Sequence, residues 1–197
     1  MAYPTVSAPF GMQAVQRLDG MPYAGAIRQI PIASGYGTAI FYGDVVKLAS
    51  TGLIVQDVGT DNATPCGVFV GCSYTDPSTS QPTFKQYLPA GIVASNIKAF
   101  VVDDPRAVFK IAVVTGTVVI GGVARAVVGS NMALVQNVGS TITGNSLNAA
   151  LTTSTNTTNT LPLRVVDVVT ETATAADTFT EILVTINTHQ YNSTTGV

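Results

Sequence analysis

The side chains best suited to catalysis in this sequence are one histidine, two cysteines and eleven acidic residues. His189 lies near the C-terminus within the segment NTHQY, which contains no carboxylate to orient it and no strong nucleophile. A Ser-His-Asp or Cys-His site requires both of these partners. The sequence therefore predicts a surface or interface histidine, and no nucleophilic catalysis.

Most of the acidic residues fall in predicted turns. Asp57 and Asp61 surround a Gly-Thr bend, and Asp103 and Asp104 directly precede a proline. Adjacent carboxylates at such positions are typical of a solvated bend or cap. Segment 57–61 also lacks the alternating oxygen ligands and final glutamate of a calcium loop. We expect no metal and no cofactor, although a hydrolase whose acids meet only in space remains an open alternative.

The two cysteines, Cys66 and Cys72, are six residues apart. On one unbroken strand they would face the same side at a separation of about 20 Å, given a rise of about 3.3 Å per residue. That distance is too long for a disulfide, and two thiols without a nearby histidine do not make a zinc site. The pattern predicts two reduced cysteines in the core.

The composition argues against several kinds of partner. Charged residues make up 10% of the chain and hydrophobic residues 46%, with a formal net charge of -2 and no cluster of basic residues. Nucleic acid is therefore not an expected partner. The apolar run 111–124 is interrupted by threonine and glycine and is too short to span a membrane, and the proline-containing start does not resemble a signal peptide. Low charge instead suits a surface hidden in an assembly.

From residue 35 onward, short runs of β-branched and aromatic residues alternate with turn residues, and no stretch has a sustained helical period. The predicted strands cover residues 38–42, 44–49, 53–56, 67–74, 84–88, 92–94, 98–102, 108–114, 117–120, 132–136, 163–169 and 179–187. We expect segment 43–48 to pair with 66–71, segment 163–169 to pair with 179–187, and the C-terminal strands to close the body. The predicted fold is all-β, a single β-barrel or β-tulip-like body over residues 35–197 with little helix.

Two segments differ from this body. Residues 1–34 contain four prolines and scattered large apolar side chains, which predicts an extended N-terminal arm. The arm could cross to a neighbouring molecule or wrap its own barrel, with 26–33 as a possible strand, and the sequence leaves both open. The candidate capsid or subunit interface residues are Tyr3, Pro4, Phe10, Met12, Met21 and Tyr23. The uncharged Thr/Asn-rich stretch 140–160 predicts an exposed loop.

Three segments together resemble those of one protein family. GDVVKL at 43–48, CGVFVG at 66–71 and EILVTINTHQY at 181–191 are similar to segments of capsid decoration or minor head structural proteins of tailed bacteriophages. The resemblance is one of pattern and composition, clearest over 35–75 and 161–191. It implies a small β-barrel or β-tulip body on the outside of an icosahedral head, commonly trimeric, with no catalytic residues.

The leading hypothesis is therefore a non-enzymatic cement protein. Its partner would be the major capsid protein, and it would lie on the outer surface of the virion after synthesis in the host cytoplasm. The alternative is a host-recognition or carbohydrate-binding β module of a phage fibre or spike. That function requires an exposed aromatic platform, for which Tyr74, Tyr87 and Tyr191 are the candidates.

Overall fold

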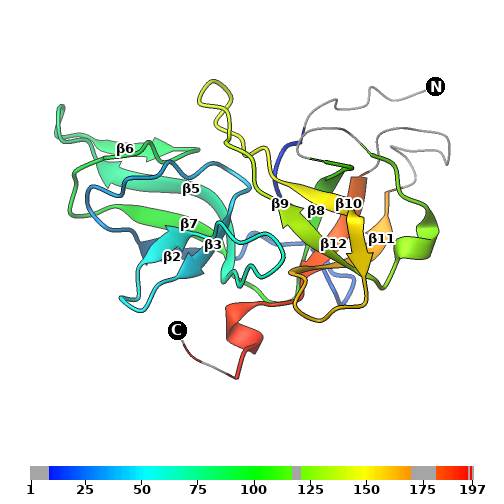
Figure 1. The fold of residues 1–197 in the computed structure, drawn as a ribbon. Coiled ribbons are helices and arrows are strands. Elements are labelled where there is room, and N and C mark those ends of the chain that lie inside the picture. Colours follow the sequence, from blue (N-terminus) through cyan, green and yellow to red (C-terminus); the bar gives the residue numbers. More distant parts are fainter. Residues whose placement is uncertain (1–8, 117–120, 170–180, 195, 197) are drawn as a thin grey trace.

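The structure is a computed structural model that describes residues 9–116, 121–169, 181–194 and 196. In these ranges twelve strands form two sheets, drawn side by side in Figure 1. The first sheet contains β1 (Gln13–Arg17), β8 (Ala107–Val114), β9 (Asn131–Val135), β10 (Ala149–Asn156), β11 (Leu163–Val168) and β12 (Glu181–Ile186). The second sheet contains β2 (Arg28–Pro31), β3 (Val45–Leu48), β4 (Ile54–Gln56), β5 (Gly67–Thr75), β6 (Pro82–Lys85) and β7 (Lys98–Val102). Two 3-10 turns, η1 (Arg125–Val127) and η2 (Gln190–Asn192), complete the described elements. The prediction of an all-β fold with little helix is confirmed.

The first sheet closes into a five-stranded barrel in the order β8-β10-β9-β11-β12, because β12 pairs back onto β8. β1 is an extra strand that pairs with the first half of β8. The second half of β8 pairs with β10, in a short parallel ladder. β11 and β12 pair in antiparallel fashion, as expected from the sequence. Closure leaves no unpaired sheet edge between these five strands.

The barrel interior is filled by alternate residues of each strand, as the two-residue period of a strand requires. In β12, Ile182, Val184 and Ile186 all point into this core, which confirms the shared face predicted from the sequence. On the opposite face, the buried carboxylate of Glu181 forms an ion pair with Lys110 of β8, at 3.3 Å. Closure of the barrel thus combines an apolar interior with one charged contact.

The second sheet has the order β2-β7-β5-β3-β4, with β6 added to β5. An isolated bridge between Ile32 and Ile54 connects the end of β2 to β4, so the sheet curls around a core of its own. Cys66 and Cys72 are buried in this core as free thiols, and the predicted reduced core cysteines are confirmed.

Adjacent residues of the second sheet belong to different cores. Val46 and Phe69 face the core of the second sheet, whereas their neighbours Val45 and Val68 belong to the cluster that fills the barrel. Val102 of β7 belongs to the same barrel cluster. One end of the outer face of the second sheet therefore packs directly against the barrel, and the two sheets share an apolar contact.

The described part of the predicted arm, residues 9–34, is not free. β1 pairs with β8, β2 pairs with β7, and Met12 is fully buried in the barrel cluster. The alternative that the segment wraps its own body holds for these residues, because it supplies one strand to each sheet. The boundary placed at residue 34 therefore does not separate an arm from a body in this range.

Several predicted strand positions also need correction. Residues 38–42 make only isolated bridges, residues 92–94 form no strand, and the predicted strand 117–120 lies outside the described residues. The Thr/Asn-rich stretch is not one continuous loop, because 149–156 form β10 of the barrel, between non-strand residues on both sides. Segments 43–48 and 66–71 do pair, through Val45 and Val68, but the C-terminal strands close the other sheet.

Candidate functional site

His189 is buried within the chain, with 1% of its surface exposed, so the prediction of a surface or interface histidine was wrong. Its Nδ1 accepts a hydrogen bond from the backbone N–H of Tyr191 at 3.1 Å, which caps the turn η2. Burial lowers the pKa of the imidazole, and the charges of Asp103 and Asp104 oppose this effect. The side chain thus caps a turn, and its environment favours the neutral form.

Asp103 and Asp104 lie in a turn, as predicted, and both are paired with arginines. Arg28 Nε is 2.9 Å from Asp103 Oδ2, and Arg17 Nε is 3.2 Å from Asp104 Oδ2. Both arginines belong to the first 34 residues, so these carboxylates anchor the N-terminal segment. Among the residues that the structure describes, no group of three or more His, Cys, Asp or Glu side chains could hold a metal ion.

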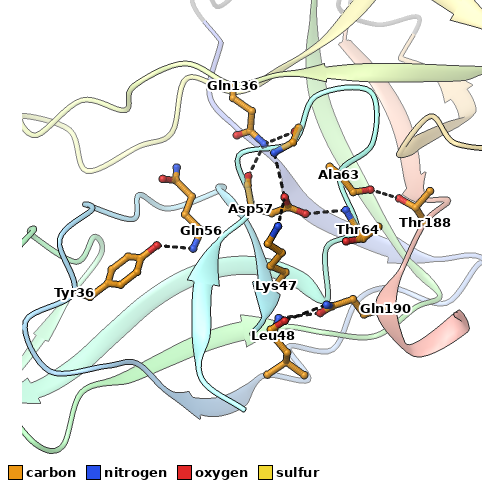
Figure 2. Close-up of polar contacts among 11 residues, drawn as sticks. Tyr36, Lys47, Leu48, Gln56, Asp57, Ala63, Thr64, Gln136, Thr188 and Gln190 are labelled. Atoms are coloured by element: carbon orange, nitrogen blue, oxygen red, sulfur yellow. Dashed lines mark hydrogen bonds and ion pairs between the residues drawn. The ribbon is translucent and has the colours of Figure 1, made fainter. Parts of the chain in front are cut away.

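Asp57, which the sequence places beside a Gly-Thr bend, is also buried. Its Oδ2 accepts a hydrogen bond from Thr64 N at 2.8 Å, and its Oδ1 is 3.3 Å from Lys47 Nζ, as Figure 2 shows. From the barrel side, Gln136 Nε2 donates to the backbone carbonyls of Asp57 at 2.7 Å and Gly59 at 3.1 Å. The carboxylate and the glutamine together fix the loop after β4 against the barrel.

Asp44 is a second buried carboxylate that bonds to a residue on the barrel side. Its Oδ2 accepts hydrogen bonds from Phe41 N at 2.8 Å and Gln56 Nε2 at 3.1 Å, and its Oδ1 accepts one from Asn148 Nδ2 at 3.2 Å. Asn148 also donates to Gln136 Oε1 at 2.8 Å. Burial raises the pKa of Asp44, and its hydrogen bonds act in the opposite direction. These contacts connect the two sheets and satisfy a buried acid, which is a structural role.

The C-terminal segment after β12 ties the sheets together from another side (Figure 2). Thr188 Oγ1 donates to the carbonyl of Ala63 at 2.6 Å. The Gln190 side chain accepts from Leu48 N at 2.8 Å and donates to Leu48 O at 3.2 Å, as a neighbouring strand would do. A hollow of about 650 Å³ borders this segment, and its lining, apart from His189, consists of uncharged side chains.

The predicted interface residues have different environments. Met12 is buried in its own core and has no surface left for a partner, and Phe10 is partly covered, with Lys110 Nζ at 5.3 Å from its ring centre. Tyr23 is half-buried and donates its hydroxyl to the carbonyl of Ala26. Met21 is 61% exposed. Tyr3 and Pro4 lie outside the described residues.

Met21 belongs to an exposed turn that we call the N-terminal hairpin, residues 13–27. Arg17 N donates to Met21 O at 2.8 Å and Tyr23 N donates to Val15 O at 3.3 Å, across a turn in which Gly20 has a φ of +82°. Four large apolar side chains of the hairpin remain exposed: Val15, Leu18, Met21 and Ile27. Met21 is among the interface residues predicted from the sequence and Leu18 is not, although the Asp-Gly turn beside Leu18 was a signal.

The base of the N-terminal hairpin is held firmly. Leu18 N donates to Arg106 O at 2.9 Å, next to the ion pair between Arg17 and Asp104. No known protein family, curated protein or solved structure matches the chain. Function is therefore inferred from the geometry of the molecule, and its clearest outward feature is this exposed apolar turn.

Proposed function

We propose that the protein is a virion structural protein that decorates and stabilises the outside of an icosahedral phage capsid. The observation that carries the proposal is the N-terminal hairpin, where four apolar side chains are exposed on a hydrogen-bonded turn. Exposed apolar side chains gathered on one feature are typical of protein interaction sites. The partner is the major capsid protein, and the protein acts as a homo-oligomer, with a trimer favoured.

The rigidity of the hairpin supports this role. A preformed turn loses little conformational entropy on binding, so more of the contact energy remains as affinity. A stable interface buries about 1,200–2,000 Å² in total, and the exposed side chains of the hairpin would supply part of that area. In a symmetric oligomer each hairpin would bind a neighbouring shell subunit, and linked contacts of modest strength would together resist release.

The test must leave the fold intact. Deletion of residues 1–25 would remove β1 and the buried Met12, so loss of binding by such a deletion would not identify an interface. Replacement of two exposed side chains, Leu18→Asp together with Met21→Asp, avoids this difficulty because neither contributes to the core. Ile142→Asp is the matched control, since Ile142 is 95% exposed in a different loop.

Binding is measured by co-sedimentation with shells assembled from the major capsid protein of the same genome. We expect the unchanged protein and the Ile142→Asp control to saturate the shells, and the double variant to bind at least about 100-fold more weakly, because two interface side chains are replaced by charges. Equal binding of all three proteins would exclude the hairpin as the contact. Failure of the unchanged protein to bind shells would overturn the proposed function itself.

A further inference from the structure

The outer face of the second sheet carries a pair of stacked aromatic rings away from the barrel contact. The rings of Phe84 on β6 and Phe100 on β7 have centroids 6.4 Å apart and planes inclined by 15°. Phe84 is 74% exposed, and Phe100 supports one side of its ring. We call Phe84 and Phe100 the aromatic platform.

A bulge in β5 makes room for this arrangement. The register of β5 against β7 shifts between Phe69 and Gly71, and Gly71 pairs with Phe100. Gly71 has a φ of +139°, and a Cβ there would lie 3.1 Å from Lys85 O and 3.5 Å from Phe100 Cδ2. Glycine at this position suits the positive φ of the bulge and its close approach to Lys85 O, and the ring of Phe100 lies beside the bulge.

Polar side chains surround the platform on the same face. Lys98 and Phe84 both pair with Ser73, from opposite sides of β5, and Gln29 pairs with Phe100. The amide of Asn96 is fixed at the rim by two hydrogen bonds with Thr75, at 2.8 Å and 3.0 Å. The side chains enclose a hollow of about 340 Å³.

The charge in this hollow has one sign. Lys98 is the charged residue of its lining, no carboxylate lines it, and Lys98 makes no ion pair with any residue that the structure describes. An exposed apolar ring, an unpaired cation and amide groups are thus gathered in one place. This combination is complementary to a ligand that has an apolar face, a negative charge and hydroxyl groups.

We propose that the aromatic platform binds a carboxylated pyranose, the uronic acid unit of an acidic polysaccharide. The axial C–H groups of a gluco-configured ring form an apolar face that would pack on Phe84. Lys98 would pair with the carboxylate, and Gln29 and Asn96 would bind hydroxyl groups. This binding activity is separate from shell attachment, because the platform and the N-terminal hairpin share no residue.

The tyrosines expected from the sequence do not offer such a surface. Tyr74 is buried, and Tyr87 stacks on Phe41 at a centroid distance of 5.3 Å. Tyr191 is partly exposed, but its hydroxyl accepts a hydrogen bond from Arg28, whose guanidinium also lies 5.3 Å from its ring centre. Sequence analysis missed Phe84 and Phe100 because their stacking depends on the pairing of both strands with β5.

The test compares two ligands that differ only at C6: cellohexaose, with a hydroxymethyl group there, and the hexauronate, in which each of these groups is oxidised to a carboxylate. Binding to the full chain is followed by calorimetric titration at low salt, with ligand concentrations up to about 10 mM. We expect the hexauronate to bind more tightly than cellohexaose. Phe84→Ala should weaken binding of the hexauronate by about tenfold, because the apolar contact is lost.

A second variant tests the role of the charge. Lys98→Gln should weaken hexauronate binding by about threefold and leave cellohexaose binding unchanged, because an exposed charge contact is modest. Ile142→Ala is the control for removal of an exposed apolar side chain elsewhere and should bind like the unchanged protein. Circular dichroism spectra should agree for all variants, because the three altered side chains, Phe84, Lys98 and Ile142, are exposed.

Three results would overturn the proposal. These are no binding of the hexauronate, binding that Phe84→Ala leaves unchanged, and equal affinity for the neutral and acidic hexasaccharides. The last result would exclude the acidic sugar even if the platform binds carbohydrate.

Discussion

At the scale of single residues, Asp44, Asp57 and His189 have side chains of types that often catalyse reactions, yet each is buried and used by the fold. A buried polar group is costly unless it is hydrogen-bonded, and Asp44 meets this requirement with three donors. The sequence could not predict this environment, because Asn148 is 104 residues from Asp44. Residue type and local spacing identified the chemical groups but not their partners.

His189 gives the first prediction at this scale. Burial lowers its pKa in the folded protein, so the unfolded chain takes up a proton first as the pH falls. The stability that follows from the neutral imidazole is therefore fully present above the ordinary histidine pKa of about 6.5, and it decreases as the pH falls below that value. Urea unfolding at about pH 7.5 and about pH 5.5 measures this loss.

The matched variant is His189→Asn, whose side-chain oxygen can still accept the hydrogen bond from Tyr191 N. Since His189 is the single histidine in the chain, this variant should show a smaller loss of unfolding free energy over the same pH interval. An equal loss in both proteins would mean that other groups carry the pH dependence. NMR titration of the imidazole in the folded protein provides an independent measurement.

At the scale of elements, the sequence predicted the strongly apolar strands and missed β10. The apolar run of β8 and the apolar residues of β11 and β12 were enough to identify these strands, because barrel cores select such residues. β10 contributes the small residues Ala149 and Ala150 to the buried part of the sheet, followed by threonines and a serine. Ser154 Oγ accepts from Ala133 N at 2.8 Å, so a polar side chain replaces part of the strand pairing there.

The crossing of the N-terminal segment over the second sheet gives a prediction about backbone contact. Gly11 has a φ of +75°, and a Cβ there would lie 2.7 Å from Ser146 Cβ and 2.8 Å from Gly43 O. Gly35 has a similar φ of +72°, but no atom lies within 4 Å of its Cβ position. Alanine substitutions at Gly11 and Gly35 therefore separate two causes of lost stability, which are the steric contact of the added methyl group and the strain of the left-handed backbone.

We expect Gly35→Ala to lower the free energy of unfolding by about 1 kcal/mol, through backbone strain alone. Gly11→Ala should lower it by about 3 kcal/mol, because the added methyl group also forces apart two packed segments. Urea unfolding of both variants measures the difference. Equal values would show that the N-terminal segment can move aside and that its crossing is not tightly packed.

At the scale of the whole molecule, the sequence predicted a β-barrel body but not a second core. Successive side chains of β3 and β5 point to opposite faces of the sheet, and both faces are apolar. Only the topology decides which face packs against which core. Val45 and Val68 belong to the barrel cluster although their strands lie in the other sheet. With the buried hydrogen bonds from Asn148 to Asp44 and Gln136, this shared contact predicts that the two sheets unfold as one cooperative unit.

The two cysteines allow this cooperativity to be measured, because both thiols lie in the core of the second sheet. Burial raises the pKa of Cys66 to about 12 and that of Cys72 to about 11, so neither reacts readily in the folded state. We expect the free energy of opening derived from thiol labelling in urea to equal that of global unfolding followed by circular dichroism.

The variants Cys66→Ser and Cys72→Ser each keep one thiol. In both variants, the free energy of opening from labelling should be the same fraction of the free energy of global unfolding. Labelling with a smaller free energy and a smaller urea dependence would mean that the second sheet opens while the barrel stays folded, and the contact between the sheets would then be a hinge.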